Sequence, residues 1–262
     1  MCFCKLTDFC LEYLVMPTVQ SHSAIPILTF HQIAPAPEKG TGFRSLSVAP
    51  ADFQRQMSFL RALGYQGLSI TALQPYLRGE RSGKVVGITF DDGYLNNLTH
   101  ALPVLRQLGF SSTCYVISAM LGQANSWDRH NRVPPSELMS AVHLRQWVAG
   151  GQEVGAHTRH HVRLTQVDTP LAQEEIALCK DELQQLTGST VDHFCYPYGE
   201  FAPEHTAMVA DAGFLTATTT RRGRCQLGDS LLELPRVPVL RRTSRPLLWW
   251  KLASRYEDRH RV

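Results

Sequence analysis

The sequence contains no apolar run long enough to cross a bilayer, no internal repeat and no low-complexity segment among its 262 residues. Its seven cysteines form neither a disulfide framework nor a metal-binding pattern, because three crowd the first ten residues and the other four stand singly. An odd, unpatterned set of cysteines favours a reducing compartment. These absences exclude a membrane-spanning protein, a solenoid and a small disulfide-stapled fold.

The chain also lacks a strong excess of charge of either sign. It has 26 basic and 23 acidic residues, for a formal net charge of +3, which is too balanced to make nucleic acid or an anionic membrane the main partner. Arginines cluster at 221–224 and again at 241–245, where they carry the charge to attract an acidic glycan. A solvated basic surface is the more common meaning of such clusters.

No secretory signal is recognisable at the N-terminus, because Lys5, Asp8 and Glu12 interrupt the segment that would have to be apolar. A second methionine, shortly before the first predicted strand, offers an alternative start that mass spectrometry of the native protein would detect. We therefore expect a poorly defined segment at 1–24, one catalytic domain at 25–262 and a cytoplasmic location.

Strand and helix patterns alternate along the rest of the chain. Apolar runs predict strands at 25–31, 66–69, 84–90, 112–117, 152–156, 192–196, 214–218 and 233–239. Amphipathic segments predict helices at 50–63, 95–108, 143–149, 168–187, 203–212 and 244–256, with a long loop at 118–139. A further helix is predicted after the strand at 66–69, within the segment 64–77. This alternation is typical of a parallel sheet covered by helices, and seven or eight units favour a closed α/β barrel. In such barrels the chemistry lies at the carboxyl ends of the strands.

Two adjacent carboxylates, Asp91 and Asp92, follow the strand predicted at 84–90. Neighbouring residues of an extended chain point to opposite sides, so the two are expected to have different roles. Gly93 lets the backbone turn sharply after them. A solvated turn, with an aspartate that caps the next helix, explains the same residues about as well.

Two histidines four residues apart, His157 and His161, follow another short strand. If this segment curls into a turn, both imidazoles reach one metal ion. With Asp92 they form a set of two histidines and one carboxylate, which leaves coordination positions open for water and substrate. Zn²⁺ is the default metal for this set, and Co²⁺, Ni²⁺ or Mn²⁺ suit the same ligands. An exposed histidine-rich loop is the alternative interpretation.

A third segment of interest is CYPY at 195–198, which ends a later strand. Proline fixes the backbone there, so that a following N–H group is available to hold an oxyanion. An aromatic turn that packs on the rim of the barrel is the alternative. Trp127 and Asp128, in the loop at 118–139, are further candidates for contact with a substrate.

The segments TFDDG at 89–93, HTRHH at 157–161 and CYPY at 195–198 resemble, in residues and order, the motifs of the polysaccharide deacetylase family. This family is carbohydrate esterase family four, with the NodB homology fold. The resemblance extends over roughly residues 25–240. It implies a distorted (β/α)7–8 barrel and a metal-dependent hydrolase that removes N-acetyl groups, by cleavage of a non-peptide C–N bond, from an N-acetylhexosamine-containing polysaccharide or oligosaccharide. In motif order the chain is most similar to members of the poly-N-acetylglucosamine deacetylase type.

The resemblance also implies roles for single residues. Asp91 resembles the general base that activates water, and Asp92, His157 and His161 resemble the ligands of the family's divalent metal. Tyr198 resembles the residue whose backbone N–H helps to hold the tetrahedral oxyanion. A carboxylate beside a dication stays ionised and can act as a base, which agrees with the first of these roles.

The chain departs from the family pattern at two points. Cys195 stands where the family usually has the arginine that orients the base, and we expect Arg236 to reach the base from a later strand instead. The late histidine that serves as general acid is also missing, because His205 and His260 fall in helical or terminal contexts. Relatives with a permuted motif order carry this histidine on the first strand, which makes His31 the candidate acid. A hydrogen-bonded histidine of the core is the alternative for that residue.

Three functions are therefore compatible with the sequence. The first is a deacetylase that acts on an acetylated glycan, with no nucleic acid partner and no integral membrane segment. The second keeps the fold and changes the substrate to a small non-polymeric amide or O-acetyl ester. The third is a non-catalytic glycan-binding relative, in which Cys195 and the missing late histidine would mark decay. The presence of Asp91, Asp92, His157 and His161 argues against the third.

Overall fold

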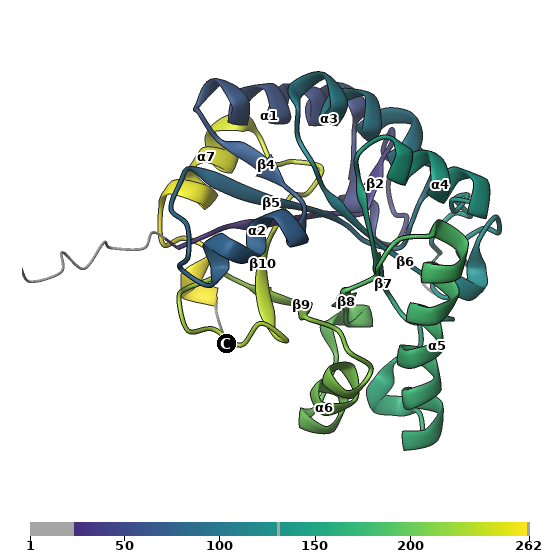
Figure 1. Ribbon diagram of the computed structural model, residues 1–262. Helices are drawn as coiled ribbons and strands as arrows, with labels where there is room; N and C mark the ends of the chain where they lie inside the picture. Colours follow the sequence, from purple (N-terminus) through teal and green to yellow (C-terminus); the bar gives the residue numbers. More distant parts are fainter. Residues whose placement is uncertain (1–23, 130–131, 261–262) are drawn as a thin grey trace, which may run out of the picture.

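The computed structural model describes residues 24–129 and 132–260, so the segment predicted at 1–24 lies almost entirely outside the described residues. Seven parallel strands close into a ring in the order β1-β10-β9-β8-β7-β6-β5, and β5 pairs with β1 to complete it (Figure 1). The predicted distorted (β/α)7–8 barrel is confirmed. The strands of the ring are β1 (Ile27–Phe30), β5 (Val85–Phe90), β6 (Thr113–Val116), β7 (Glu153–Ala156), β8 (His193–Cys195), β9 (Thr216–Arg222) and β10 (Leu234–Pro238).

An eighth strand explains why the number of units is ambiguous between seven and eight. β4 (Gln66–Leu68) pairs with the first residues of β5, whereas β6 pairs with the last residues of β5 on the same edge. β4 therefore fills the space between β5 and β6 only at the amino ends of the strands. At the carboxyl ends, where the candidate residues lie, the ring has seven strands.

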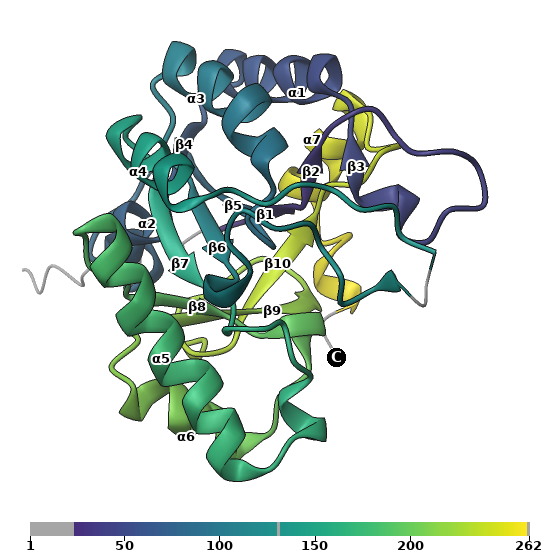
Figure 2. The same ribbon diagram turned by 90° about the vertical axis from the view of Figure 1, so that its right-hand side faces the viewer.

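The α-helices lie around the outside of the strands (Figures 1 and 2). A small separate sheet, β2 (Gln32–Ile33) paired with β3 (Ser47–Val48), follows β1. The helices of the described residues are α1 (Pro50–Ala62), α2 (Ile70–Leu77), α3 (Leu102–Leu108), α4 (Ala141–Ala149), α5 (Thr169–Thr187), α6 (Pro203–Asp211) and α7 (Arg245–Ala253).

Two predicted helices differ from the observed ones. The helix predicted at 95–108 is divided, with a π-helical turn at Asn97–Ala101 ahead of α3. Pro103 has no N–H group for the regular helical ladder, which favours the wider turn before it. The helix predicted at 244–256 ends at Ala253.

Aromatic packing connects the helices to the barrel. Phe30, Phe53, Phe90 and Trp147 are fully buried and form a chain of ring contacts with centroid distances of 5.2 to 5.8 Å. These contacts tie α1 and α4 to β1 and β5. All six residues of β5 are buried, as expected for a parallel strand covered on both faces. The packing thereby fixes the end of β5 and the two aspartates that follow it.

A largely buried polar cluster occupies the opposite, amino ends of the strands. Glu153 at the start of β7 accepts hydrogen bonds from the hydroxyl groups of Thr71 and Thr113, and it lies 3.1 Å from Nε2 of His193. The other ring nitrogen of His193 contacts the hydroxyl of Thr216 at 2.8 Å. Burial alone would raise the pKa of Glu153, but His193 and the two hydroxyl groups lower it to about 2. The ionised carboxylate therefore links several strands of the barrel.

Glu153→Gln is expected to lower the free energy of unfolding near neutral pH by about 2–3 kcal/mol, since one pKa unit corresponds to about 1.4 kcal/mol. The folded-state pKa is depressed, so this contribution is present above the unfolded-state value of 4.5 and is lost as the pH falls toward 2. Urea unfolding of both proteins near pH 7 and near pH 3 measures the difference, which should shrink at the lower pH. The exposed Glu80→Gln is the matched control, and an equal loss at both pH values would contradict this account.

Candidate active site

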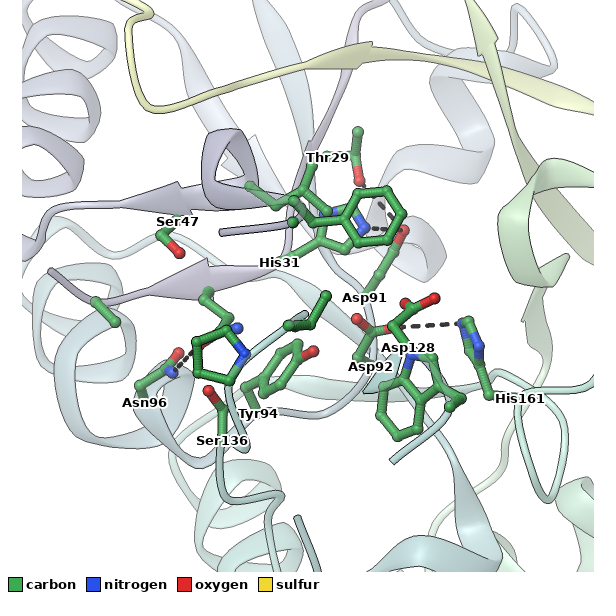
Figure 3. A pocket seen from close by; sticks show the side chains of 18 of the residues that line it. Thr29, His31, Ser47, Asp91, Asp92, Tyr94, Asn96, Asp128, Ser136 and His161 are labelled. Carbon is green, nitrogen blue, oxygen red and sulfur yellow. Dashed lines mark hydrogen bonds and ion pairs between the residues drawn. The ribbon is translucent and has the colours of Figure 1, made fainter. Parts of the chain in front are cut away.

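The carboxyl ends of the barrel strands surround a cavity of about 650 Å³ (Figure 3). Segments far apart in the sequence meet there because the closed ring brings their strand ends together. Every residue that the sequence singles out for chemistry lines this cavity. They are His31, Asp91, Asp92, Trp127, Asp128, His157, His161, Tyr198 and Arg236.

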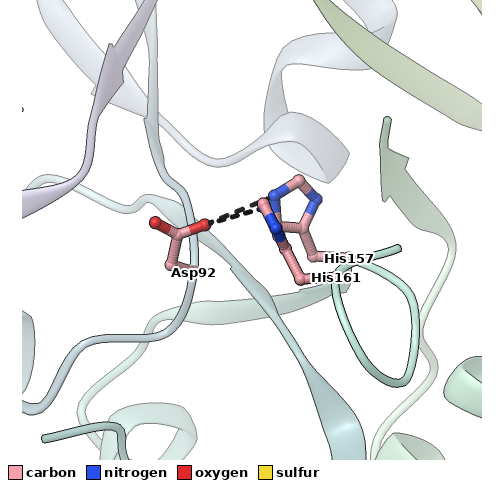
Figure 4. Close-up of side chains that lie close together, drawn as sticks. All are labelled: Asp92, His157 and His161. Atoms are coloured by element: carbon pink, nitrogen blue, oxygen red, sulfur yellow. Dashed lines mark ion pairs between the residues drawn. The ribbon is translucent and has the colours of Figure 1, made fainter. Parts of the chain in front are cut away.

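Three buried side chains, those of Asp92, His157 and His161, converge on one side of the cavity (Figure 4). Nε2 of each histidine lies 3.5 Å from Oδ1 of Asp92, and the potential ligand atoms all lie within 4.8 Å of one another. Nδ1 of His157 contacts the carbonyl oxygen of Cys195 at 2.7 Å. This contact holds a proton on Nδ1, so Nε2 is the ring nitrogen that faces Asp92. Burial would lower the pKa of His157, but the hydrogen bond with Asp92 helps to raise it, so a metal ion that binds Nε2 has to displace a proton.

The three residues fit a divalent metal ion. One carboxylate and two imidazoles are a donor set of catalytic metal sites. Nε2 of His161 faces Asp92, whereas Nδ1 on the other side of the ring is buried and has no hydrogen-bond partner within the described ranges. Burial lowers the pKa of His161 to about 3, so its ring is neutral and able to coordinate. Burial would raise the pKa of Asp92, but its surroundings, with the hydrogen bond to His157 as the main contribution, lower it, so this carboxylate is ionised.

The backbone adopts left-handed conformations at three of the candidate residues. The φ angle is 73° at Asp92, 58° at His161 and 58° at Tyr198. Residues other than glycine rarely adopt this conformation, and each instance costs on the order of 1–3 kcal/mol. Strain of this kind is concentrated at functional sites. The adjacent carboxylates of Asp91 and Asp92 accordingly contact different partners.

Asp91 faces a buried guanidinium group. Arg236 on β10 donates to both carboxylate oxygens, from Nη1 to Oδ1 at 2.6 Å and from Nη2 to Oδ2 at 2.7 Å. Further hydrogen bonds to the carbonyl of Thr219 at 2.9 Å and the hydroxyl of Thr89 at 3.2 Å fix the guanidinium. Burial would raise the pKa of Asp91, but the charge and hydrogen bonds of Arg236 outweigh it and lower the pKa. Asp91 is therefore an ionised carboxylate held in one orientation.

The departure from the family pattern at Cys195 is coupled to this pair. Sγ of Cys195 lies 3.3 Å from Nη2 of Arg236. The side chain at the position of the usual arginine thus contacts the guanidinium that arrives from β10. A second arginine at 195 would bring two like charges together in a buried site. Cys195 and Arg236 are two parts of one arrangement.

His31 lies beside the same carboxylate. Its Nε2 is 3.9 Å from Oδ2 of Asp91, and its side chain is 25% exposed toward the cavity (Figure 3). The ring is therefore accessible from the cavity rather than enclosed in the apolar core. The backbone carbonyl of His31 accepts a hydrogen bond of 2.9 Å from the buried Asn97, which fixes the chain just after β1.

Aromatic rings cover the candidate metal ligands. The ring of His161 contacts those of Trp127 and Tyr198, with centroid distances of 4.8 and 4.6 Å. The guanidinium of Arg163 lies 3.7 Å from the centroid of the Tyr198 ring. Tyr94, which the sequence analysis does not single out, shares a hydrogen bond with Asp92; burial and the charge of Asp92 raise the pKa of this tyrosine. The site is thus enclosed by rings as well as by charged groups.

A glutamate that the sequence analysis also misses holds the loop between the two histidines. Glu175 on α5 is 2% exposed, and its Oε2 accepts the backbone N–H groups of Arg159 and His160 at 2.8 Å each. Its Oε1 lies 2.6 Å from Nδ1 of His160. The carboxylate supplies hydrogen bonds that the turn from His157 to His161 does not make within itself. The sequence signal is a glutamate within the buried stripe of α5, which also contains Ala172, Ile176 and Cys179.

Glu175→Ala is expected to weaken Zn²⁺ or Co²⁺ binding by about 10–100-fold, because groups that orient metal ligands have effects of this size. Glu175→Gln keeps one acceptor oxygen and should have a smaller effect. Isothermal titration of metal-stripped protein measures both. The neighbouring Glu174→Ala is the matched control, since Glu174 is half exposed and pairs with the side chain of Arg159 rather than with the backbone of the turn. Equal metal affinity in the two alanine variants would show that Glu175 has no positioning role.

Comparison with known proteins identifies relatives of this chain. The sequence profile of the family described as polysaccharide deacetylase matches residues 78–217, which is more than half of the chain. The YxkH protein of Bacillus subtilis (strain 168), which carries the provisional name polysaccharide deacetylase, is 26% identical over 217 residues, covering 82% of this chain and 71% of that protein. The poly-β-1,6-N-acetyl-D-glucosamine N-deacetylase of Escherichia coli (strain K12) is 30% identical over 87 residues, covering 32% of this chain and 12% of that protein.

A solved structure shows the same fold. The deacetylase PplD of Streptococcus pyogenes, in complex with acetate, matches with a TM-score of 0.77 at 23% identity, covering 87% of this chain and 98% of that one. The matched profile includes both aspartates, both histidines and Tyr198, whereas His31 and Arg236 lie outside it. The protein therefore belongs to the polysaccharide deacetylase family, carbohydrate esterase family four, whose members are hydrolases that act on C–N bonds.

Proposed function

We propose that this protein is a metal-dependent N-deacetylase that removes acetyl groups from an N-acetylhexosamine-containing polysaccharide or oligosaccharide, with Zn²⁺ as the resident metal. The observation that carries the proposal is the convergence of Asp92, His157 and His161 beside the ionised and oriented Asp91. A divalent cation held there would lower the pKa of a water molecule and polarise the acyl oxygen of the substrate. A site that only binds sugar does not require two imidazoles and a carboxylate whose donor atoms lie within 4.8 Å of one another.

Asp91 is assigned the role of general base. Its lowered pKa keeps it ionised at neutral pH, so it is able to take a proton from the attacking water. Arg236 acts on this step through Asp91, because two parallel hydrogen bonds fix the carboxylate and leave it one orientation. Arg236 is in this sense a positioning residue for the base.

His31 is assigned the role of general acid. The support for this is its exposure to the cavity and its distance of 3.9 Å from Asp91, on the side of the cavity formed by β1. From there an imidazolium is able to give a proton to the leaving amine nitrogen of the sugar. His31→Ala should therefore lower kcat and leave metal affinity unchanged; full activity in this variant would rule the assignment out.

The backbone N–H of Tyr198 is assigned to the developing oxyanion. In support, the turn at this residue is fixed on both sides. The hydroxyl of Thr220 donates to the Tyr198 carbonyl at 3.2 Å. Gly199, with φ of 71°, has no room for a side chain because a Cβ there would collide with Thr220. The turn that would present the N–H is thus held by a hydrogen bond and by close packing.

An acetylated glycan is the proposed substrate for two reasons. The E. coli relative that matches 87 residues is named for action on poly-β-1,6-N-acetyl-D-glucosamine. The cavity also offers aromatic rings, Trp127 and Tyr94 among them, beside its charged groups, and such a combination suits the apolar faces and hydroxyl groups of a pyranose.

Acetate release from three kinds of substrate tests the proposal. They are oligomers of N-acetylglucosamine, O-acetylated xylo-oligosaccharides, and a small N-acetyl amide such as N-acetylpropylamine. We expect kcat/KM for the N-acetylglucosamine oligomers to exceed the other two by at least about 100-fold, as sites built to pair with substrate hydroxyl and amide groups discriminate strongly. A preference for the ester or the small amide would favour the second function. Binding of the oligomers without any acetate release would favour the glycan-binding relative.

A further inference from the structure

The solvent-facing side of α7 is apolar. Pro246, Trp249, Trp250 and Ala253 recur at spacings of three and four residues and are all exposed. The two tryptophans are 47% and 50% exposed, which is unusual for the largest apolar side chains. α7 is apolar on two sides, and packing within the chain uses only one of them. The side packed against the rest of the protein consists of Leu248, Lys251 and Leu252.

Arginines flank this exposed side at both ends. Arg242 and Arg245 stand at the start of α7, and Arg255 follows its end; all are exposed. Within the part of the chain that the structure describes, none of the three forms an ion pair. Asp52, which lines a surface pocket with Arg245, pairs with Arg55, and the carboxylates that follow α7 pair with other residues. Glu257 pairs with Arg222 and Lys251, and Asp258 pairs with Arg224. The charge of the three arginines is therefore available to a partner.

We propose that the α7 surface, formed by Trp249, Trp250, Arg242, Arg245 and Arg255, binds the face of an anionic lipid bilayer. A helix with aromatic residues on one side and arginines around them is typical of segments that lie in the headgroup layer. The indole rings enter that layer while the guanidinium groups pair with lipid phosphates. None of the described helices is long and apolar enough to cross a membrane.

Charge favours a lipid surface over the glycan. An acetylated hexosamine polymer is neutral and leaves the arginines unpaired, and removal of acetyl groups produces amines that the arginines repel. Adjacent residues of a helix point about 100° apart, so Trp249 and Trp250 do not form one flat platform for a sugar, whereas both can enter a headgroup layer. The near-neutral total charge of the chain does not prevent attraction to an anionic bilayer. Salt screens charges beyond about 10 Å, so the arginines close to the bilayer determine the attraction. The proposed binding does not depend on the hydrolytic reaction.

Co-sedimentation of the full chain with vesicles tests the proposal. Vesicles of phosphatidylcholine are compared with vesicles that also contain phosphatidylglycerol. We expect binding to the anionic vesicles, a blue shift of tryptophan fluorescence, and weaker binding as salt is raised. Trp249→Ala/Trp250→Ala and Arg242→Gln/Arg245→Gln should each weaken this binding by at least about tenfold.

Matched control variants carry the same types of change elsewhere on the surface. Val142→Ala/Leu171→Ala removes exposed apolar side chains from α4 and α5, and Arg81→Gln/Arg106→Gln removes exposed arginines. These variants should bind anionic vesicles as the unaltered protein does, and all variants should retain its metal affinity. Equal binding to neutral and anionic vesicles, or unchanged binding by the α7 variants, would overturn the proposal. Binding to soluble polyglucuronate without binding to vesicles, or self-association that the α7 changes abolish without any vesicle binding, would overturn it as well.

Discussion

Asp91→Asn is expected to lower kcat for deacetylation by a factor of about 10²–10⁴, the usual contribution of a positioned general base. Asparagine has the size of aspartate and can still accept one hydrogen bond from Arg236, but it cannot take a proton from water. Metal affinity should be unchanged, because Asp91 is not among the converging ligand atoms. Steady-state rates and isothermal titration with Zn²⁺ on the same preparation measure both quantities.

Two comparisons make this result specific. Glu137 is an exposed carboxylate on the wall of the same cavity, and Glu137→Gln should leave kcat within about a factor of two if general-base catalysis belongs to one carboxylate. Asp91→Asn also leaves the buried Arg236 without its anionic partner, so its unfolding temperature will fall, and rates are compared where both proteins are folded. An Asp91→Asn enzyme with more than a tenth of the original kcat would show that another group is the base.

Arg236→Met is expected to lower the free energy of unfolding by about 3–5 kcal/mol, because it leaves the buried carboxylate of Asp91 unpaired. It should also shift the pH profile. Arg236 lowers the pKa of Asp91, so its loss raises that pKa, and the acidic limb of kcat/KM moves to higher pH. Arg236→Lys keeps the positive charge but not the two parallel hydrogen bonds. Its stability and its acidic limb should therefore lie between those of the unaltered protein and those of Arg236→Met. A variant that is destabilised but keeps the original acidic limb would limit Arg236 to a structural role.

An exchange of Cys195 and Arg236 tests whether the guanidinium can act from either position. Cys195→Arg/Arg236→Cys moves the guanidinium to the place where the family usually has it, and the two side chains already touch. We expect this double variant to recover much of the activity that Arg236→Cys alone loses. Cys195→Arg alone should be destabilised by the repulsion of two buried guanidinium groups. No recovery in a folded, metal-binding double variant would contradict the view that Cys195 and Arg236 are one arrangement.

Much of the barrel is predictable from the sequence because each strand is a short apolar run with a polar residue at its end. His31, Asp91 and His157 mark the carboxyl ends of β1, β5 and β7, and a closed parallel ring requires such ends to meet. The shared edge of β5, used first by β4 and then by β6, is a matter of register between distant strands. No local pattern reports such a register, and the number of strands in the ring was ambiguous for that reason.

Residues that contact the candidate site residues from other elements of the fold are harder to predict from the sequence. Glu175 is informative only once α5 is known to pack beside the loop that carries His157 and His161, and Tyr94 only once its hydroxyl is known to reach Asp92. These contacts depend on how helices dock onto the barrel. The contact of Arg236 with Asp91 was predictable for another reason. The family pattern has an arginine at position 195 that orients the base, and because this chain has Cys195 instead, an arginine from another strand was expected.

The two apolar sides of α7 illustrate a different limit. From the sequence, the arginines at 241–245 are most simply interpreted as a solvated surface. The sequence also does not tell which of the two apolar sides of the following helix packs against the core. Only the packed structure shows that Leu248 and Leu252 face inward, while Trp249 and Trp250 remain exposed. A local excess of apolar and basic side chains is thus hidden by the ordinary composition of the whole chain.

The most direct test of the central claim is acetate release from N-acetylglucosamine oligomers by metal-stripped protein, before and after addition of Zn²⁺ or Co²⁺. His161→Ala, which removes one of the three converging side chains, is measured beside it. The account predicts an inactive stripped protein, activity restored by the metal, and no restoration in His161→Ala. Stripped protein that releases acetate as fast as metal-treated protein, or an intact chain that binds no divalent metal, would contradict it.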